Sequence, residues 1–250
     1  MRRLRSPRPR NRKVRSKFCV ILMANKGSSR HMSALAAPRF YAIHGKEHRY
    51  VVKPNPGRHT LERSLAVGLV LGKLGVAARK NDVSRILKSG NVHVNGKVIR
   101  EIKYPVGLND VIELKHEGKS YRIGVDSLAK ISLESVKKAE AEPQTYKVVG
   151  KYKAGGGVVM IRLNDGRCLK AEHSVKVNDS VALGAKGAVK KVLPMAVGAK
   201  CIVIDGVHVG KTGKVKEVKK GTMNVVPTAL VEPESGDQFE TLIKNIMVTG

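Results

Sequence analysis

A change in hydrophobic periodicity in the first half of the chain constrains its fold more than any other feature of the sequence. Apolar residues first recur with the spacing of a helix in residues 61–74, which Thr60 can cap and Gly75 can end. The same spacing returns over a shorter stretch, between Asn81 as a good N-cap and Gly90 as a residue suited to a left-handed C-terminus. The sequence therefore predicts two helices joined by a short turn.

Directly after the second helix the hydrophobic period becomes two. Valines alternate with polar residues before Asn95-Gly96, a pair typical of a type I′ turn, and a return strand follows. Two more strand patterns occur at Val111–Leu114 and Ser120–Val125. Helix, turn, helix and hairpin in this close succession predict one compact module, which we expect to span residues 61–126.

The second half of the chain has the pattern of short β-strands separated by Gly, Asn-Asp and Pro. A spacing of about 8–12 residues is typical of small barrels, so we expect a central β domain over residues 144–195 and a last one over residues 196–250. The strand candidates are Val158–Leu163, Ser180–Leu183, Cys201–Ile204, Lys214–Val218, Met223–Val226 and Gln238–Leu242. Residues 127–143 are polar and rich in Glu and Lys, which predicts a connector with a short helix at most. The expected class is an α+β, multi-domain protein.

Two turns in these halves resemble each other. Gly107-Leu108-Asn109-Asp110-Val111 is similar to Lys176-Val177-Asn178-Asp179-Ser180. The similarity fits either a duplicated turn or the common use of Asn-Asp before a strand, and we favour the second explanation.

The balance of charge indicates the class of partner. The 250 residues include 48 Lys+Arg against 20 Asp+Glu, a formal charge of +28. A folded body this basic repels itself, so a polyanion is the expected partner, and a nucleic acid fits better than a membrane surface. Aromatic residues are few, with three Phe, six Tyr and no Trp, which favours contacts with phosphates and RNA shape over the stacking of bases.

The N-terminal residues form a separate problem. Residues 1–22 hold nine basic residues and no acidic one, which predicts a leader that is disordered until an anion neutralises it. It fits an RNA-binding arm, an Arg-rich targeting peptide, or a start codon assigned too far upstream of Met23, and we favour the last. Removing those nine charges still leaves +19. Residues 23–60 then form an irregular basic segment.

Enzymatic, metal-binding and membrane classes find little support. Three cysteines without a CxxC pair and eight scattered histidines argue against a disulfide framework or structural zinc and fit a reducing cytosol. No base is placed beside a nucleophile, and no apolar run approaches the roughly 18 residues of a membrane span. We therefore expect no enzyme activity, no catalytic residues, no metal, no cofactor, no small-molecule substrate and no membrane partner.

The most specific motif is the run of residues 74–97. It resembles the alpha-L RNA-binding module, which is a helix-turn-helix followed by a hairpin. The charges support the same interpretation, because a cluster of cations on a rigid helix–turn–helix can follow an RNA backbone. The candidate RNA-binding residues here are Arg79, Lys80, Arg85 and Lys88 around the second helix, with Lys97 and Arg100 on the hairpin.

A second motif runs from Cys201 to Val215. It looks like the KOW motif of small SH3-like barrels, so the last domain is expected to be SH3-like. The exposed cations of this region would be Lys211, Lys214, Lys216, Lys219 and Lys220. Direct RNA contact and a purely architectural hairpin remain equal alternatives for this motif.

The two motifs in this order, together with Pro56-Gly57-Arg58-His59 and Tyr104-Pro105-Val106-Gly107, resemble the small-subunit ribosomal protein S4e family over residues 24–250. The resemblance implies a structural constituent of the small ribosomal subunit in the cytoplasm, with small-subunit rRNA and neighbouring ribosomal proteins as partners. It adds Lys26, Arg30, Arg39 and Arg58 as candidate RNA contacts. The chain departs from the family at Met32-Ser33-Ala34, where relatives are more basic, and at Tyr41, where they have Trp.

Two other functions remain as alternatives. A KOW-type transcription or translation factor would bind ribosomes transiently. An RNA-modifying enzyme of the pseudouridine-synthase type can also carry the alpha-L module, but it would require a large mixed α/β domain where this chain predicts small barrels.

Overall fold

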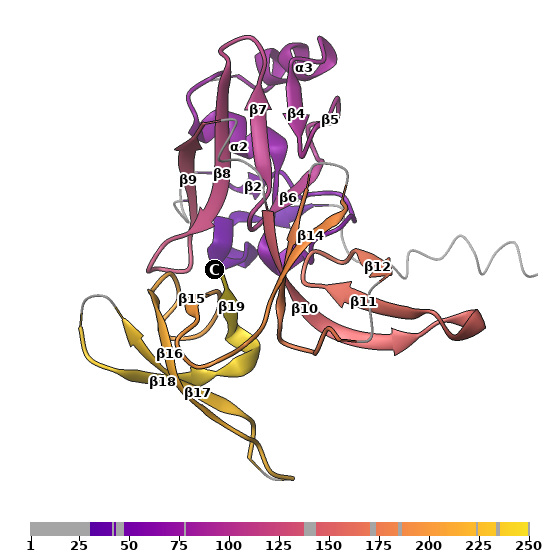
Figure 1. Cartoon of the computed structure of the whole chain (residues 1–250). Coiled ribbons are helices and arrows are strands. Elements are labelled where there is room, and N and C mark those ends of the chain that lie inside the picture. Colours follow the sequence, from indigo (N-terminus) through magenta and orange to yellow (C-terminus); the bar gives the residue numbers. More distant parts are fainter. Residues whose placement is uncertain are drawn as a thin grey trace, which may run out of the picture. The chain divides into compact units, whose positions relative to one another are not determined.

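Antiparallel strands make up most of the regular secondary structure, as the alternation of Val, Ile and Leu with polar residues predicts (Figure 1). The computed structural model describes residues 31–41, 43, 48–77, 79–137, 144–170, 174–184, 187–223, 225–233 and 236–249. Residues 31–250 form one unit, separate from residues 1–30. The leader at residues 1–22 and the candidates Lys26 and Arg30 therefore lie outside the described residues.

The described part of the segment before the module contains only short elements. Its two short strands pair with each other, and two 3-10 helices occur among the described residues between them. These elements are β1 (Met32–Ser33), η1 (Ala34–Ala36), η2 (Arg39–Tyr41) and β2 (Tyr50–Val51).

The first helix of the module begins later than the sequence predicts. Its elements are η3 (Leu61–Arg63), β3 (Ser64–Ala66) and α2 (Val67–Lys73), with β6 (Pro105–Gly107) beside β3. Leu65 pairs with Val106 and both side chains are fully buried, so this leucine belongs to a strand and not to a helical stripe. The expected helix over residues 61–74 was therefore wrong in its first half, and Thr60 makes no capping bond with its side chain.

The second helix, α3 (Lys80–Lys88), lies close to its expected place. It begins just before the expected cap at Asn81, with Arg79 at the N-cap position. Gly75 and Gly90 adopt positive φ angles of 71° and 78°, so both helices end at the glycines that the sequence indicates.

A five-stranded antiparallel sheet completes the module. The hairpin turn has φ angles of 51° at Asn95 and 76° at Gly96, as a type I′ turn requires. In spatial order the strands are β5 (Lys97–Val98), β4 (Val92–Val94), β7 (Val111–Leu114), β8 (Lys119–Val125) and β9 (Ile131–Val136). Strand β9 contradicts the expectation of a connector with a short helix at most. It is an edge strand with one half-exposed face. The polar residues on that face interrupt the apolar alternation from which a strand would be predicted.

The next five strands form a second antiparallel sheet, in the order β12-β11-β10-β13-β14. Strand β10 is central and pairs with both β11 and β13. Its bounds and those of its neighbours are β10 (Gln144–Lys153), η4 (Gly155–Gly157), β11 (Val159–Leu163), β12 (Cys168–Lys170), β13 (Ser180–Leu183) and β14 (Val189–Leu193). Buried aliphatic side chains of β10, β11 and β13 surround Tyr146 and form a core of their own.

The last sheet is also five-stranded and antiparallel, in the order β18-β17-β16-β15-β19. Its elements are β15 (Lys200–Val203), β16 (Thr212–Lys219), β17 (Thr228–Pro233), β18 (Phe239–Leu242), η5 (Ile243–Asn245) and β19 (Ile246–Val248). The expected strand at Met223–Val226 was wrong. Thr222 and Val225 exchange backbone hydrogen bonds there, and Met223 is fully exposed, so these apolar residues form the tip of the β16–β17 hairpin.

The two similar Asn-Asp sequences adopt the same turn. Asn109 and Asn178 have φ angles of 64° and 76°. In each turn the following aspartate is buried and accepts a hydrogen bond from the amide three residues earlier, at 3.0 Å in Asp110 and 2.9 Å in Asp179. The shared geometry explains why both positions require the Asn-Asp pair before a strand.

A buried lysine joins the second and third sheets. The Lys147 side chain, on β10, donates from Nζ to the carbonyl oxygens of Ile243 at 2.5 Å and Ile246 at 2.8 Å. Burial and the charge of Arg63 lower the pKa of Lys147 to about 8. Between this pKa and the ordinary value of 10.5, the unfolded chain binds a proton here that the folded chain lacks.

We therefore expect the stability of the wild-type protein to rise with pH relative to Lys147→Met. From about pH 8 to about pH 9.5 the free energy of unfolding should gain about 1.5 kcal/mol in the wild-type protein relative to the variant. Urea denaturation followed by circular dichroism at both pH values measures this difference. Lys153→Met, on an exposed position of the same strand, is the control and should keep the wild-type profile. Parallel pH profiles for wild type and Lys147→Met would contradict the assignment.

Candidate nucleic-acid interface

Helix α3 carries a row of exposed cations. Val83 and Leu87 are buried, so the opposite face of the helix lies in solvent. Arg79, Lys80, Arg85 and Lys88 are all exposed. Asp82 Oδ1 lies 4.0 Å from Arg85 Nη1, a loose contact between solvated groups that leaves the guanidinium accessible. Across the described ranges, no ion pair involves the other three cations.

The β4–β5 hairpin adds two more cations beside this helix. Lys97 lies on β5 and Arg100 follows it, and both side chains are exposed. The hairpin and the end of α3 are adjacent, because a Cβ on Gly90 would lie 3.6 Å from Val98 Cγ1. Figure 1 shows α3, β4 and β5 together at one end of the module. The six module candidates therefore belong to two neighbouring elements, and we define them as the module cations.

The half-buried side-chain amide of Asn95 holds the hairpin turn in place. Asn95 donates from Nδ2 to Asp110 Oδ1 at 2.7 Å, and its Oδ1 accepts the Val111 amide at 2.9 Å. The same oxygen accepts a hydrogen bond from Gln144 Nε2 at 2.8 Å. The side chain of one turn residue thus ties the hairpin to β7 and to the first residue of β10.

The Asp110 carboxylate lies at the centre of this network and is 1% exposed. Its Oδ2 accepts from His59 Nε2 at 2.8 Å and from the Gly107 amide at 3.0 Å. Burial alone would raise the pKa of Asp110, but the hydrogen bond and charge of His59, with the bonds from Gly107 and Asn95, lower it below the usual value. Gly107 cannot be larger, because a Cβ there would lie 2.4 Å from His59 Nδ1.

The network continues into the second sheet. Tyr146 donates its hydroxyl to Gln144 Oε1 at 2.7 Å and accepts from Arg167 Nη2 at 3.0 Å. The Arg167 guanidinium lies 4.9 Å above the Tyr146 ring and forms an ion pair with the buried Asp165. Sequence reasoning missed these residues. The one signal in the sequence was the Gly107–Val111 stretch, whose resemblance to the second Asn-Asp turn marks a constrained aspartate.

The remaining N-terminal candidates are separate from the helix. Arg39 lies in η2 and Arg58 precedes η3, and both are exposed. Arg58 is adjacent to His59, whose ring is held by Asp110. Arg39 lines a cavity in the segment before the module. The structure therefore does not gather these two with the module cations.

The cations of the last sheet are partly engaged within the protein. Lys211, Lys214, Lys216, Lys219 and Lys220 are all exposed on or beside β16. Lys219 Nζ lies 3.2 Å from Glu240 Oε1, and the hydrogen bonds from Thr228 and Lys219 lower the pKa of Glu240. Lys214 faces Glu232 across the sheet, and Lys211 Nζ lies 5.3 Å from the centre of the Phe239 ring. This surface is therefore less uniformly cationic than the module.

The β15–β16 loop also has an architectural role. Gly210 has a φ of 77°, and a Cβ there would lie 2.8 Å from the carbonyl carbon of Asp126, in the β8–β9 turn. Asp205 in the same loop forms an ion pair with Arg63 of η3. Through these two contacts the loop holds the last sheet against the module.

Other kinds of site find no support in the described part of the chain. Among these residues, no group of three or more His, Cys, Asp and Glu side chains could hold a metal ion. No helix within them is long and apolar enough to cross a membrane. Cys168 is exposed, Cys201 is buried, and neither forms a disulfide.

Comparisons with known proteins agree with this arrangement. Three family models match: the RS4NT (NUC023) domain at residues 26–62, the S4 domain at residues 69–112 and the Ribosomal family S4e at residues 117–187. The S4 match covers all but the first two residues of α2, together with α3 and the cationic hairpin.

Among similar proteins, the small ribosomal subunit protein eS4 of Staphylothermus marinus is 30% identical over 239 residues, covering 91% of this chain and 95% of that protein. The protein of the same name from Methanocella arvoryzae is 34% identical over 222 residues, covering 88% and 94%. The crystal structure of the 30S ribosomal protein S4e from Thermoplasma acidophilum matches with a TM-score of 0.65 and 28% identity, over 75% of this chain and 95% of that one.

The Asp110 network leads to a prediction for stability. Asp110→Ala leaves three donors without their acceptor in a buried site, so we expect a loss of about 3–5 kcal/mol in the free energy of unfolding. Chemical denaturation measures the loss, and amide hydrogen exchange at Val94 and Val111 should become faster. The pKa of Asp110 is lower in the folded protein than in the unfolded chain. The free energies of unfolding of wild type and Asp110→Ala should therefore become more similar as the pH falls below the ordinary value of 3.8.

Asp237→Ala is the matched control, because it removes an exposed carboxylate from a loop. It should change stability by less than about 0.5 kcal/mol. Equal effects of the two substitutions would refute the role given to Asp110.

Proposed function

The chain belongs to the ribosomal S4e family, and from this premise we propose that it holds small-subunit rRNA through the phosphate contacts of its module. It is a structural constituent of the small ribosomal subunit, with rRNA and neighbouring ribosomal proteins as its partners. Its function is not enzymatic. We place the subunit that contains it in the cytoplasm.

One observation carries the proposal: six exposed cations lie on two adjacent elements whose geometry is fixed from inside. Among the described residues, the one ion pair of these cations is the loose contact between Arg85 and Asp82, so their charge is available to an external anion. When RNA phosphates take the place of solvent, condensed counterions are released, and the gain in their entropy drives binding. Arginines at positions 79 and 85 can also bind phosphates through two parallel hydrogen bonds.

We further propose the finer organisation of the chain. The alpha-L module comprises residues 61–126 with β9 added, the central β domain residues 144–195, and the last domain residues 196–250. We assign the last domain as an SH3-like barrel with a KOW motif. Five antiparallel strands, and a 3-10 turn (η5) leading into a short final strand beside β15, support this assignment. Its loop packs on the module, so we give the KOW segment an architectural role first and RNA contact second.

The architecture also bears on the enzyme alternative. A pseudouridine-synthase-type enzyme requires a large mixed α/β domain, whereas the described residues after 144 form two antiparallel five-stranded sheets. That hypothesis is therefore wrong for this chain.

The first test removes the cations of α3. With Arg79, Lys80, Arg85 and Lys88 changed to Ala, binding to a small-subunit rRNA fragment should weaken. The slope of log affinity against log salt should fall by about 0.7–0.9 for each phosphate that the variant no longer neutralises. Filter binding at several salt concentrations measures both quantities. Val83 and Leu87 are retained, so the variant should fold.

The matched control keeps the charge. Arg79→Lys with Arg85→Lys should leave the salt slope near the wild-type value and lower the affinity modestly, because an ammonium group cannot form the two parallel bonds of a guanidinium. An unchanged affinity and salt slope in the quadruple Ala variant would exclude α3 from the interface.

The second comparison concerns β16. Changing Lys211, Lys214, Lys216 and Lys220 to Ala removes the same number of charges, yet we expect a smaller fall in rRNA affinity, since two of these lysines face groups of the protein itself. A fall equal to that of the α3 variant would show that both surfaces bind RNA. Retention of wild-type protein on small subunits after a high-salt wash distinguishes a resident constituent from a transient factor.

A further inference from the structure

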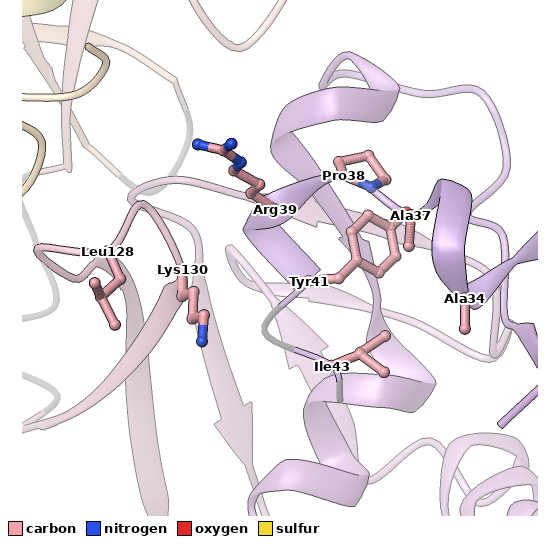
Figure 2. Close-up of a pocket in the computed structure, with 8 residues that line it drawn as sticks. All are labelled: Ala34, Ala37, Pro38, Arg39, Tyr41, Ile43, Leu128 and Lys130. Carbon is pink, nitrogen blue, oxygen red and sulfur yellow. The ribbon is translucent and has the colours of Figure 1, made fainter. Parts of the chain in front are cut away.

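A cavity of about 350 Å³ lies between the N-terminal segment and the β8–β9 turn (Figure 2). The N-terminal segment lines it with Pro38, Arg39, Tyr41 and Ile43, and the turn lines it with Leu128 and Lys130. This volume is at the lower end of the range for small-ligand pockets.

One of the lining residues, Tyr41, carries a buried polar group without a partner among the described residues. Tyr41 is 1% exposed, and its hydroxyl has no hydrogen-bond partner within the described part of the chain. Burial raises the pKa of Tyr41 to about 12, so the hydroxyl remains protonated at neutral pH and can donate. A buried hydroxyl without a partner is unfavourable, and a ligand that accepts its hydrogen bond would remove that penalty.

The rim of the cavity is cationic and partly apolar. Arg39 and Lys130 are exposed, and none of the described residues forms an ion pair with either. Lys130 also helps to lower the pKa of Lys73, after burial, which shows that a second ammonium group lies near this rim. Leu128 is 64% exposed, so an apolar side chain lies beside these cations. The site thus combines an anion-binding rim, an apolar wall and a buried hydrogen-bond donor.

We propose that this cavity binds one unpaired nucleotide of the RNA. Its phosphate contacts Arg39 and Lys130, its base lies against Leu128, Pro38 and Ile43, and a base or ribose oxygen or nitrogen accepts the hydrogen bond of Tyr41. The proposal rests on the proposed function and deepens it, because α3 would supply affinity without sequence information while the cavity would select an RNA shape. A free nucleoside monophosphate has the same chemistry, so the experiment must separate the two sources.

The experiment compares RNA hairpins that differ in one nucleotide. Four hairpins carry a single bulged A, C, G or U, and a fifth is fully paired. The wild-type chain should bind at least one bulged hairpin more tightly than the paired one. Tyr41→Phe should lower this preference by about three- to tenfold, and Arg39→Gln with Lys130→Gln should lower it by about tenfold or more.

Two controls separate the cavity from the rest of the RNA-binding surface. Lys170→Gln with Lys176→Gln removes two exposed charges elsewhere and should leave the preference unchanged. The quadruple Ala variant of α3 should weaken binding to all five hairpins but keep the preference. Weaker binding with an unchanged preference in that variant would support the cavity and α3 as separate sites.

Stability measurements add an independent readout. Tyr41→Phe removes a buried hydroxyl that has no partner among the described residues, so the free variant should be at least as stable as the wild type. If Tyr41 had a purely structural role, Tyr41→Phe would not weaken the preference for the bulged hairpin while leaving the stability of the protein unchanged or higher.

A titration with adenosine, cytidine, guanosine and uridine 5′-monophosphates separates the two sources: binding of a free monophosphate without any preference among the hairpins would assign the cavity to a free nucleotide and overturn its assignment to RNA. NMR signals of the Ile43 and Leu128 methyl groups should shift with at least one of them and not with inorganic phosphate. Equal binding of bulged and paired hairpins, a preference that survives the cavity variants, or shifts reproduced by phosphate alone would overturn the proposal. Failure of the α3 variant to weaken RNA binding would count against the proposed function only.

Discussion

The described structure depends on one buried carboxylate. Asp110 is almost wholly shielded from solvent, yet it is fully provided with donors: an imidazole, a backbone amide and the Asn95 amide. A buried charge is tolerable only when it is paired and hydrogen-bonded, so these groups must stay together. Because they come from the segment before η3, the hairpin turn and the β7 turn, the carboxylate fixes the three relative to each other. Through Gln144 and Tyr146 it also reaches the second sheet.

A rigid interior gives the outer charges a fixed arrangement. The module cations lie on or directly beside a nine-residue helix and a two-residue hairpin strand, elements too short to be stable by themselves. Their positions follow from Leu87 and Val83 in the core and from Asn95 at the turn. An anionic partner therefore meets charges whose spacing is already set, and less conformational entropy is lost on binding.

Local chemistry made much of this predictable from the sequence. Gly75, Gly90 and Asn95-Gly96 define the two helix ends and the hairpin, because positive φ angles favour these residues. The outer face of α3 follows equally from the spacing of Val83 and Leu87. Long-range pairing was not predictable. Leu65 joins a strand because Val106 lies opposite, and β9 exists because β8 provides its partner. The His59–Asp110 pair spans 51 positions and leaves no periodic trace.

The distribution of acidic residues completes the electrostatic argument. With only 20 carboxylates against 48 cations, the placement of each carboxylate determines which cations are neutralised. Asp110, Asp165 and Asp179 are buried and accept hydrogen bonds from the protein itself, where they organise turns. Glu240 holds Lys219 on the last sheet. Among the described residues, the one ion pair of the module cations joins Arg85 to Asp82, and at 4.0 Å it neutralises little. The first four of these acids thus hold turns and a strand pair within the protein, and the surface that we propose for RNA binding keeps its positive charge.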